Sequence, residues 1–143
     1  MFKLTPHKSA QWMYALLALF FGVAFFVLGT AGLQAMSPED YGELAVSFEI
    51  EHMAGVQLCA ALMMTFGLLF NGRWRWSAAF RLAGAIVVVA LCAMLAWSSA
   101  FAPNGWPFAT YNIGFAGAGM TIAWWNLVDV RAAIFWGRDG KAV

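Results

Sequence analysis

The chain has 143 residues, of which 63% are hydrophobic and only 10% are charged. Soluble domains carry about 25% charged residues, because a soluble surface must be covered with polar groups. Eight basic and seven acidic side chains cannot cover a protein of this size, so the composition predicts an integral membrane protein. The net charge of +1 gives no basic surface for nucleic acid. The two cysteines, Cys59 and Cys92, lie far apart in apolar segments, which argues against a disulfide framework or a zinc site.

Four segments are apolar and long enough to cross a bilayer. A bilayer core about 30 Å thick requires roughly 20 apolar residues in a helix. The segments that meet this condition are 12–33, 53–70, 82–101 and 108–128. None alternates with a period of two, which argues against transmembrane strands. The first segment is longer than the apolar part of a signal peptide, so we expect it to be retained. The predicted fold is a single all-α domain, an antiparallel four-helix membrane bundle.

The basic residues predict how this bundle is oriented. All eight lie before the first segment, between the second and third, or after the fourth, which places them on one side of the membrane. Five of the seven acidic residues lie on the other side, in the region from Glu39 to Glu51. Basic residues remain in the cytoplasm. We therefore expect both termini to be cytoplasmic and the protein to lie in a bacterial inner membrane.

Tryptophan and arginine side chains near the predicted membrane boundaries are candidate anchors. Indole rings favour the headgroup region, and arginines bind lipid phosphates. Arg81 lies one turn or more inside the predicted third helix, and we expect its long side chain to extend outward to the membrane surface. Asp129 and Arg131 are expected to stay at the same surface. The candidate anchors are Trp12, Arg73, Trp74, Arg75, Trp76, Arg81, Trp106 and Trp136.

The long connection between the first and second segments contains a helix-start pattern. Ser37 can cap a helix, and Pro38 suits its first position. The second helix would then run from Pro38 to the Asn71–Gly72 pair, which is typical of a helix end. The alternative is a short amphipathic helix over Pro38–Ile50, lying on the outer membrane surface.

The end of this connection holds the clearest polar group, which consists of Glu49, Glu51, His52 and Gln57. Glu49 and His52 share a helix face at the Glu-x-x-His spacing of di-metal bundles. Such sites require a second copy of the motif, which the chain lacks, so an acidic, solvated helix end is favoured. The second histidine, His7, lies on the opposite side of the predicted membrane, which argues against a bis-histidine haem. We expect no metal, no cofactor and no catalytic residue.

Two further patterns bear on activity. No acidic residue lies in the middle of a predicted span, which argues against proton-coupled transport and points to a non-enzymatic protein. Small residues on the first and fourth segments allow close helix contacts, either within the bundle or between copies of the chain. The candidate packing residues are Gly22, Gly29, Gly114 and Ala118.

The segment Asn71–Gly84 resembles a pattern found in small four-span membrane proteins of tailed bacteriophages and prophages. The matching positions are the Asn71–Arg75 turn, Ser77, Arg81 and Gly84, and the family also ends with an aspartate before a basic tail, like Asp129 here. This resemblance implies a holin-like role, in which the protein accumulates in the inner membrane and then oligomerises into lesions. The nearly uniform apolar character of the first and third segments departs from that role, because it leaves no evident polar lining for a pore.

Three functions are therefore compatible with the sequence. The first is a holin-like lesion former that acts by self-association in the lipid bilayer. The second is an accessory subunit of a larger respiratory or photosynthetic membrane complex. The third is a small-molecule binding or transport module whose mouth lies near His52.

Overall fold

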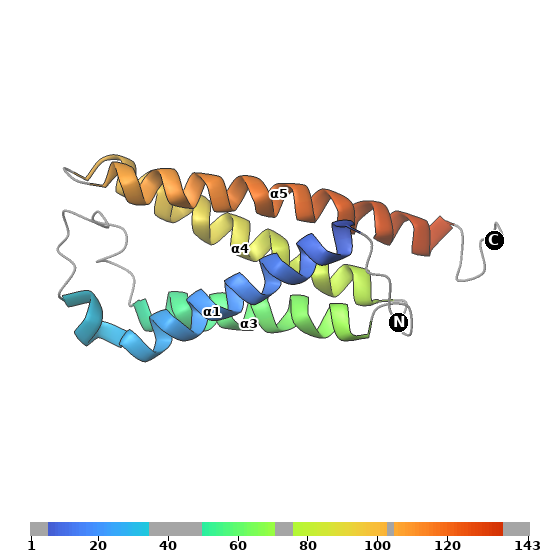
Figure 1. Ribbon diagram of the computed structural model, residues 1–143, viewed down its shortest axis with the longest axis horizontal. Coiled ribbons are helices and arrows are strands. Elements are labelled where there is room, and N and C mark those ends of the chain that lie inside the picture. Colours follow the sequence, from blue (N-terminus) through green and yellow to red (C-terminus); the bar gives the residue numbers. More distant parts are fainter. Residues whose placement is uncertain (1–5, 35–49, 71–75, 103–104, 136–143) are drawn as a thin grey trace.

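The computed structural model describes residues 6–34, 50–70, 76–102 and 105–135. Regular secondary structure in this part of the chain is entirely helical, which confirms the predicted all-α class there. The four helices are α1 (Pro6–Gln34), α3 (Ile50–Leu69), α4 (Ser77–Ala100) and α5 (Trp106–Phe135). They alternate in direction, so α1 begins and α5 ends at the same end of the molecule (Figure 1). We call this the terminal end, and the opposite end, where α1 ends and α3 begins, the loop end.

The helices extend beyond the apolar segments that predicted them. α1 begins at Pro6 rather than near residue 12, and α5 continues to Phe135 rather than ending near residue 128. Span prediction measures only the apolar part of a helix, whereas backbone hydrogen bonding continues through polar residues. The described residues do not include Pro38, where a helix start was expected, or the Asn71–Gly72 pair, where its end was expected. Of the alternative helix over Pro38–Ile50, they include only Ile50.

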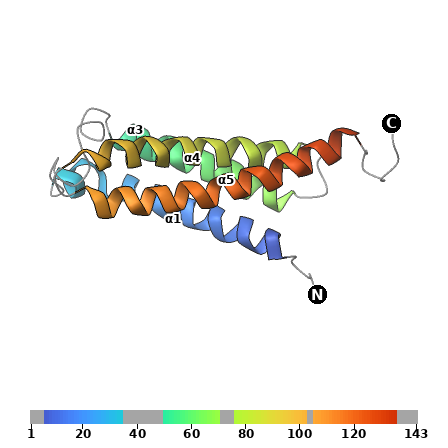
Figure 2. The same cartoon turned by 90° about the horizontal axis from the view of Figure 1, so that it is seen from above.

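α4 occupies a central place in the packing. It lies against α3 on one side and against α5 on the other, while α1 packs mainly on α3 and touches α5 more lightly. α1 crosses the other helices obliquely, as the turned view shows (Figure 2). Each helix therefore neighbours the one that precedes or follows it among the described elements, which is the up-and-down arrangement of a four-helix bundle.

Small residues dominate the helix contacts. The buried apolar residues are mostly alanines, among them Ala15 and Ala18 of α1 and Ala60 and Ala61 of α3. Gly84 of α4 lies so close to α3 that a Cβ atom there would stand 2.5 Å from the Ala60 carbonyl oxygen. Small side chains let helix backbones approach closely, which strengthens the van der Waals contact between them.

Within the described ranges, two segments are long and apolar enough to cross a membrane by length and composition. They are His52–Leu69 of α3 and Ser77–Ala100 of α4. α1 has 29 residues and α5 has 30. At 1.5 Å per residue both measure roughly 45 Å, more than the thickness of a bilayer core.

Replacing Gly84 with alanine should destabilise the bundle, because the added methyl group meets backbone and the Met64 side chain at 2.6 Å. We expect the free energy of unfolding in detergent to fall by about 1–3 kcal/mol. The matched control is Gly55→Ala in α3, where a Cβ meets nothing within 4 Å. That control should leave stability unchanged or raise it by up to about 1 kcal/mol, since alanine favours helix. Equal effects of the two substitutions would contradict the close α3–α4 contact.

Candidate functional site

The candidate site is built around Arg81, which lies inside the bundle. Its side chain is only 2% exposed, although it belongs to the second turn of α4 near the terminal end. The structure thus places Arg81 differently from the expected outward-reaching anchor. The reason is that α4 turns this residue toward α1 and α5, where polar groups compensate the charge, so the side chain has no need to reach the membrane surface.

Three neighbouring groups accept hydrogen bonds from the Arg81 guanidinium. Nη1 donates to Oε1 of Gln11 on α1 at 2.7 Å, and Nη2 donates to Oδ2 of Asp129 on α5 at 2.9 Å. Nε donates to the Ser77 carbonyl oxygen at 3.4 Å, one turn earlier on α4. We call Gln11, Ser77, Arg81 and Asp129 the Arg81 cluster.

The fourth helix makes room for the arginine. A Cβ atom at Gly67 of α3 would stand 2.6 Å from Cγ of Arg81 and 2.7 Å from the Ser77 carbonyl oxygen. Any other residue at position 67 would therefore push the side chain aside. Arg81 of α4 thus binds side chains of α1 and α5, and its stem lies against α3. These contacts link the positions of the four described helices.

The Arg81–Asp129 ion pair is asymmetric. Arg81 is 2% exposed, whereas the Asp129 side chain is 45% exposed. A charge taken out of water is costly unless it is paired and hydrogen-bonded. Gln11 and Asp129 supply these bonds, and the exposed side of the carboxylate retains access to the surroundings at the terminal end. The cluster is therefore a buried cation whose compensating anion lies at the edge of the bundle.

The bundle interior holds two polar groups without a hydrogen-bond partner among the described residues. They are both amide atoms of Asn126, which is fully buried on α5, and the hydroxyl group of Tyr14 on α1. The Tyr14 ring stacks on Phe115 of α5, with centroids 4.6 Å apart. No pattern in the sequence distinguishes these two residues from ordinary polar residues in helix contacts.

Other polar side chains also face inward. Gln57, 8% exposed, donates from Nε2 to the Ala18 carbonyl oxygen on α1 at 3.4 Å. Ser98, Ser99 and Asn112 are also buried. These amide and serine side chains thus lie between the helices, whereas Thr110 and Thr121 of α5 are exposed.

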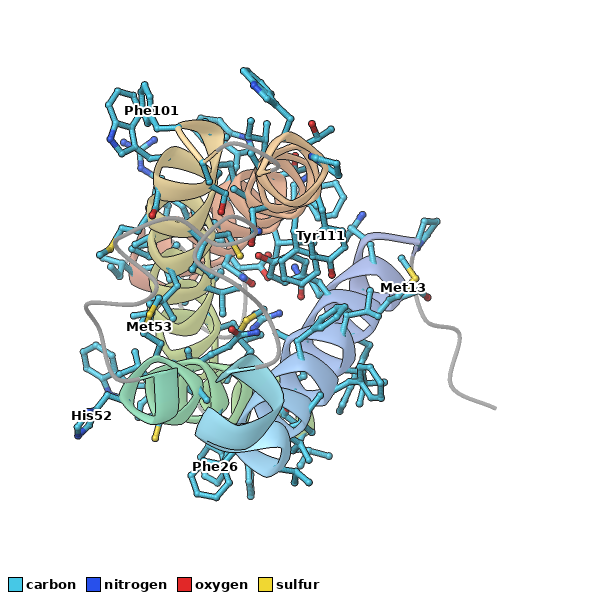
Figure 3. The ribbon with its side chains drawn as sticks, turned by 90° about the vertical axis from the view of Figure 1, so that its left-hand side faces the viewer. Met13, Phe26, His52, Met53, Phe101 and Tyr111 are labelled. Atoms are coloured by element: carbon cyan, nitrogen blue, oxygen red, sulfur yellow. The ribbon has the colours of Figure 1, made fainter. Side chains whose placement is uncertain are left out.

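Two residues of the predicted outer polar group, His52 and Gln57, have described side chains, and these two lie in different surroundings. His52 is exposed and points away from the bundle at the loop end (Figure 3). Gln57 is buried against α1 instead. Glu51 belongs to the first turn of α3, and Glu49 lies outside the described residues. Within the described ranges, no three histidine, cysteine or acidic side chains form a group that could hold a metal ion.

The predicted anchors divide into three groups. Trp76 and Trp106 are exposed, at the terminal and loop ends respectively. Trp12 is partly buried against the core, and Arg81 is buried. Trp97 is 69% exposed beside Phe101 and adds to the aromatic residues at the loop end. Arg73, Trp74, Arg75 and Trp136 lie outside the described residues.

The predicted packing residues also differ in their surroundings. A Cβ at Gly22 of α1 would lie 3.2 Å from the Leu58 backbone of α3, which is a close contact. Gly114 and Ala118 of α5 are exposed, and nothing lies within 4 Å of a Cβ at Gly114. The close contact of α5 is made by Gly119, which faces Tyr14 and Val89. Gly29 lies within α1, and the structure does not describe its surroundings.

No protein-family model, curated protein or solved structure matches the chain. The site must therefore be interpreted from its own chemistry. A buried charged side chain in an apolar bundle is a functional-site candidate, because a buried charge is costly to retain. Arg81 directly precedes the predicted third segment, 82–101, and its side chain is nevertheless 2% exposed.

Removing the carboxylate of the ion pair should destabilise the bundle more than removing both charges. Asp129→Leu leaves the Arg81 charge buried with only Gln11 and a carbonyl oxygen, and we expect a loss of about 2 kcal/mol in the free energy of unfolding. The double variant Arg81→Met/Asp129→Leu should recover most of this loss. Denaturation in detergent, followed by circular dichroism, measures both.

The control for this pair is Arg131→Met, which removes an exposed charge from the same helix. It should change stability by less than about 0.5 kcal/mol. If the double variant is no more stable than Asp129→Leu alone, the unpaired charge of Arg81 is not the cause of the destabilisation.

Proposed function

We propose that this protein is a membrane-embedded four-helix bundle that acts by self-association as a holin-like lesion former. The observation that carries the proposal is the distribution of polarity. Large apolar side chains cover the outside, including Phe20 at 66% and Val27 at 75% exposure. Arg81 and Asn126 are buried. Such an arrangement suits a lipid environment, in which apolar surface is not penalised and polar groups must be satisfied internally.

The exposed apolar residues point in several directions around the bundle. Met13, Phe26 and Phe101 project from different sides in the view along the helices (Figure 3). They are 63%, 58% and 73% exposed. A single apolar patch would favour a protein partner, whereas apolar surface on several sides favours lipid. This supports insertion of the whole bundle, including α1 and α5.

The basic residues of the described helices support the proposed orientation. Lys8, Arg81 and Arg131 belong to the terminal end, whereas Glu51 belongs to the loop end. With basic residues on the cytoplasmic side, the terminal end faces the cytoplasm and the loop end faces outward.

The inward-facing polar groups supply what lesion formation requires. Gln11, Gln57, Arg81, Asn112 and Asn126 lie between the helices of one bundle. When several copies associate and their helices separate, these groups become available to line a water-filled opening. The interior of the closed bundle thus provides the polar surface that the individual helix sequences do not reveal. The phage-type pattern at Asn71–Gly84 agrees with this role.

The alternative module with a mouth near His52 has less support, because His52 and Gln57 do not share a site. Expression of the protein alone distinguishes an accessory subunit from a lesion former. A subunit would remain harmless when expressed alone and would copurify with other proteins at a fixed ratio.

Expression in bacteria should permeabilise the inner membrane, and purified protein should release dye from lipid vesicles.

An engineered disulfide bond between α1 and α3 tests whether these helices must separate. A Cβ at Gly22 would lie 3.4 Å from Leu58 Cβ, close to the separation in a disulfide. The test variant is Gly22→Cys/Leu58→Cys, in which Cys59 is replaced by serine and Cys92 by alanine. We expect its dye release to fall by roughly 80% or more when it is oxidised, because the disulfide bond would block a step that lesion formation requires.

Reduction should restore dye release, and each single-cysteine variant should be insensitive to oxidant. Full leakage from the oxidised double variant would contradict opening between α1 and α3. No leakage from the unmodified protein at high density in vesicles would contradict lesion formation itself.

Reporter fusions test the orientation. A fluorescent protein joined to the C-terminus should fold and fluoresce, because that end is placed in the cytoplasm. Alkaline phosphatase inserted within residues 35–49 should be active, and the same enzyme joined to the C-terminus should be inactive. The reverse pattern would contradict the assignment of the two ends.

A further inference from the structure

The side-chain amide of Asn126 is buried inside the bundle without a hydrogen-bond partner among the described residues. Asn126 is 0% exposed, and neither Nδ2 nor Oδ1 has a hydrogen-bond partner among the described residues. An unpaired buried amide costs about 1–3 kcal/mol, and most buried polar groups bind protein or an ordered water molecule. An isolated amide in this place is therefore energetically unfavourable.

The position of Asn126 relates it directly to the Arg81 cluster. Asn126 and Asp129 lie three residues apart on α5, so they share a face with Cβ atoms about 5–6 Å apart. Asp129 binds Arg81 at 2.9 Å. The Asn126 amide is thus one helical turn farther into the bundle than the ion pair, and on the side of α5 that carries it.

The Arg81 guanidinium retains hydrogen-bond donors that its described partners do not use. A guanidinium has two N–H groups on each terminal nitrogen. The bonds to Gln11 and Asp129 use one on each, so both Nη1 and Nη2 keep a second donor. The side chain is 2% exposed, which denies these donors bulk solvent.

We propose that a water molecule bound inside the bundle joins the Asn126 amide to the Arg81–Asp129 pair. Polar atoms bridged by one water, each at about 2.8 Å, lie roughly 4.5–5.5 Å apart. This matches the spacing of one helical turn. A buried water binds two to four polar partners. Arg81 donors, the Asn126 amide and the carboxylate of Asp129 provide them. The water completes the polar layer at the terminal end, and the site does not depend on lesion formation.

A double-mutant cycle tests whether the two side chains are coupled. Asn126→Leu should lower the ratio of folded to unfolded protein in detergent roughly tenfold, because the bridge loses a partner. In the Arg81→Met background the same substitution should change the ratio less than about twofold. A dry, isolated amide predicts instead that Asn126→Leu raises stability to the same extent in both backgrounds, and that result would overturn the proposal. Thr121→Val is the matched control, since Thr121 lies exposed on α5 and bonds its own helix.

Water can also be detected directly in the unmodified protein. Solid-state NMR in lipid bilayers measures magnetisation transfer from water to asparagine side-chain amides, and Asn126→Leu identifies the Asn126 signal by its loss. We expect rapid transfer to Nδ2 of Asn126 and a severalfold slower transfer in Arg81→Met. No transfer to Asn126 in the unmodified protein would overturn the proposal even if Arg81→Met failed to fold. Unchanged transfer in Arg81→Met would show that the water does not join the two residues.

Discussion

The burial of one arginine constrains the whole bundle. Arg81 is 2% exposed, and a cation in that position must be paired and hydrogen-bonded. Its partners come from different helices, with Gln11 on α1 and Asp129 on α5, while Gly67 of α3 leaves space for its stem. A rotation or shift of any one helix would break a bond or close this space. The interaction therefore fixes the rotation and register of all four helices relative to one another.

Close packing of small residues is the second requirement of this arrangement. Alanines fill the α1–α3 contact, and Gly84 brings α4 against the α3 backbone. Polar groups between helices must find partners within reach, and short separations allow this. Gln57 reaches the Ala18 carbonyl oxygen across the α1–α3 contact for that reason. Packing and internal hydrogen bonding are thus two effects of the same short distances.

The polarity of the bundle gives the proposed function its physical basis. Apolar side chains on several sides suit lipid, and the polar groups are stored between the helices. The closed bundle keeps Gln11, Arg81 and Asn126 away from its surroundings. Separation of its helices would expose those groups together, because they share one interior. The ion pair at the terminal end and the glycine contacts between helices oppose that separation.

The sequence by itself determined that the chain is helical, where its apolar segments lie and how its charges are segregated, because these follow from composition and local periodicity. It also predicted Gly22 as a packing residue, and a Cβ there would lie 3.2 Å from the Leu58 backbone. Only the tertiary structure decided that Arg81 turns inward, that Gly119 rather than Gly114 makes the α5 contact, and that Asn126 lacks a partner. The direction in which a helical side chain points depends on how neighbouring helices are rotated. That rotation is set by contacts between residues far apart in the chain, such as Arg81 with Gln11, and no local pattern contains it.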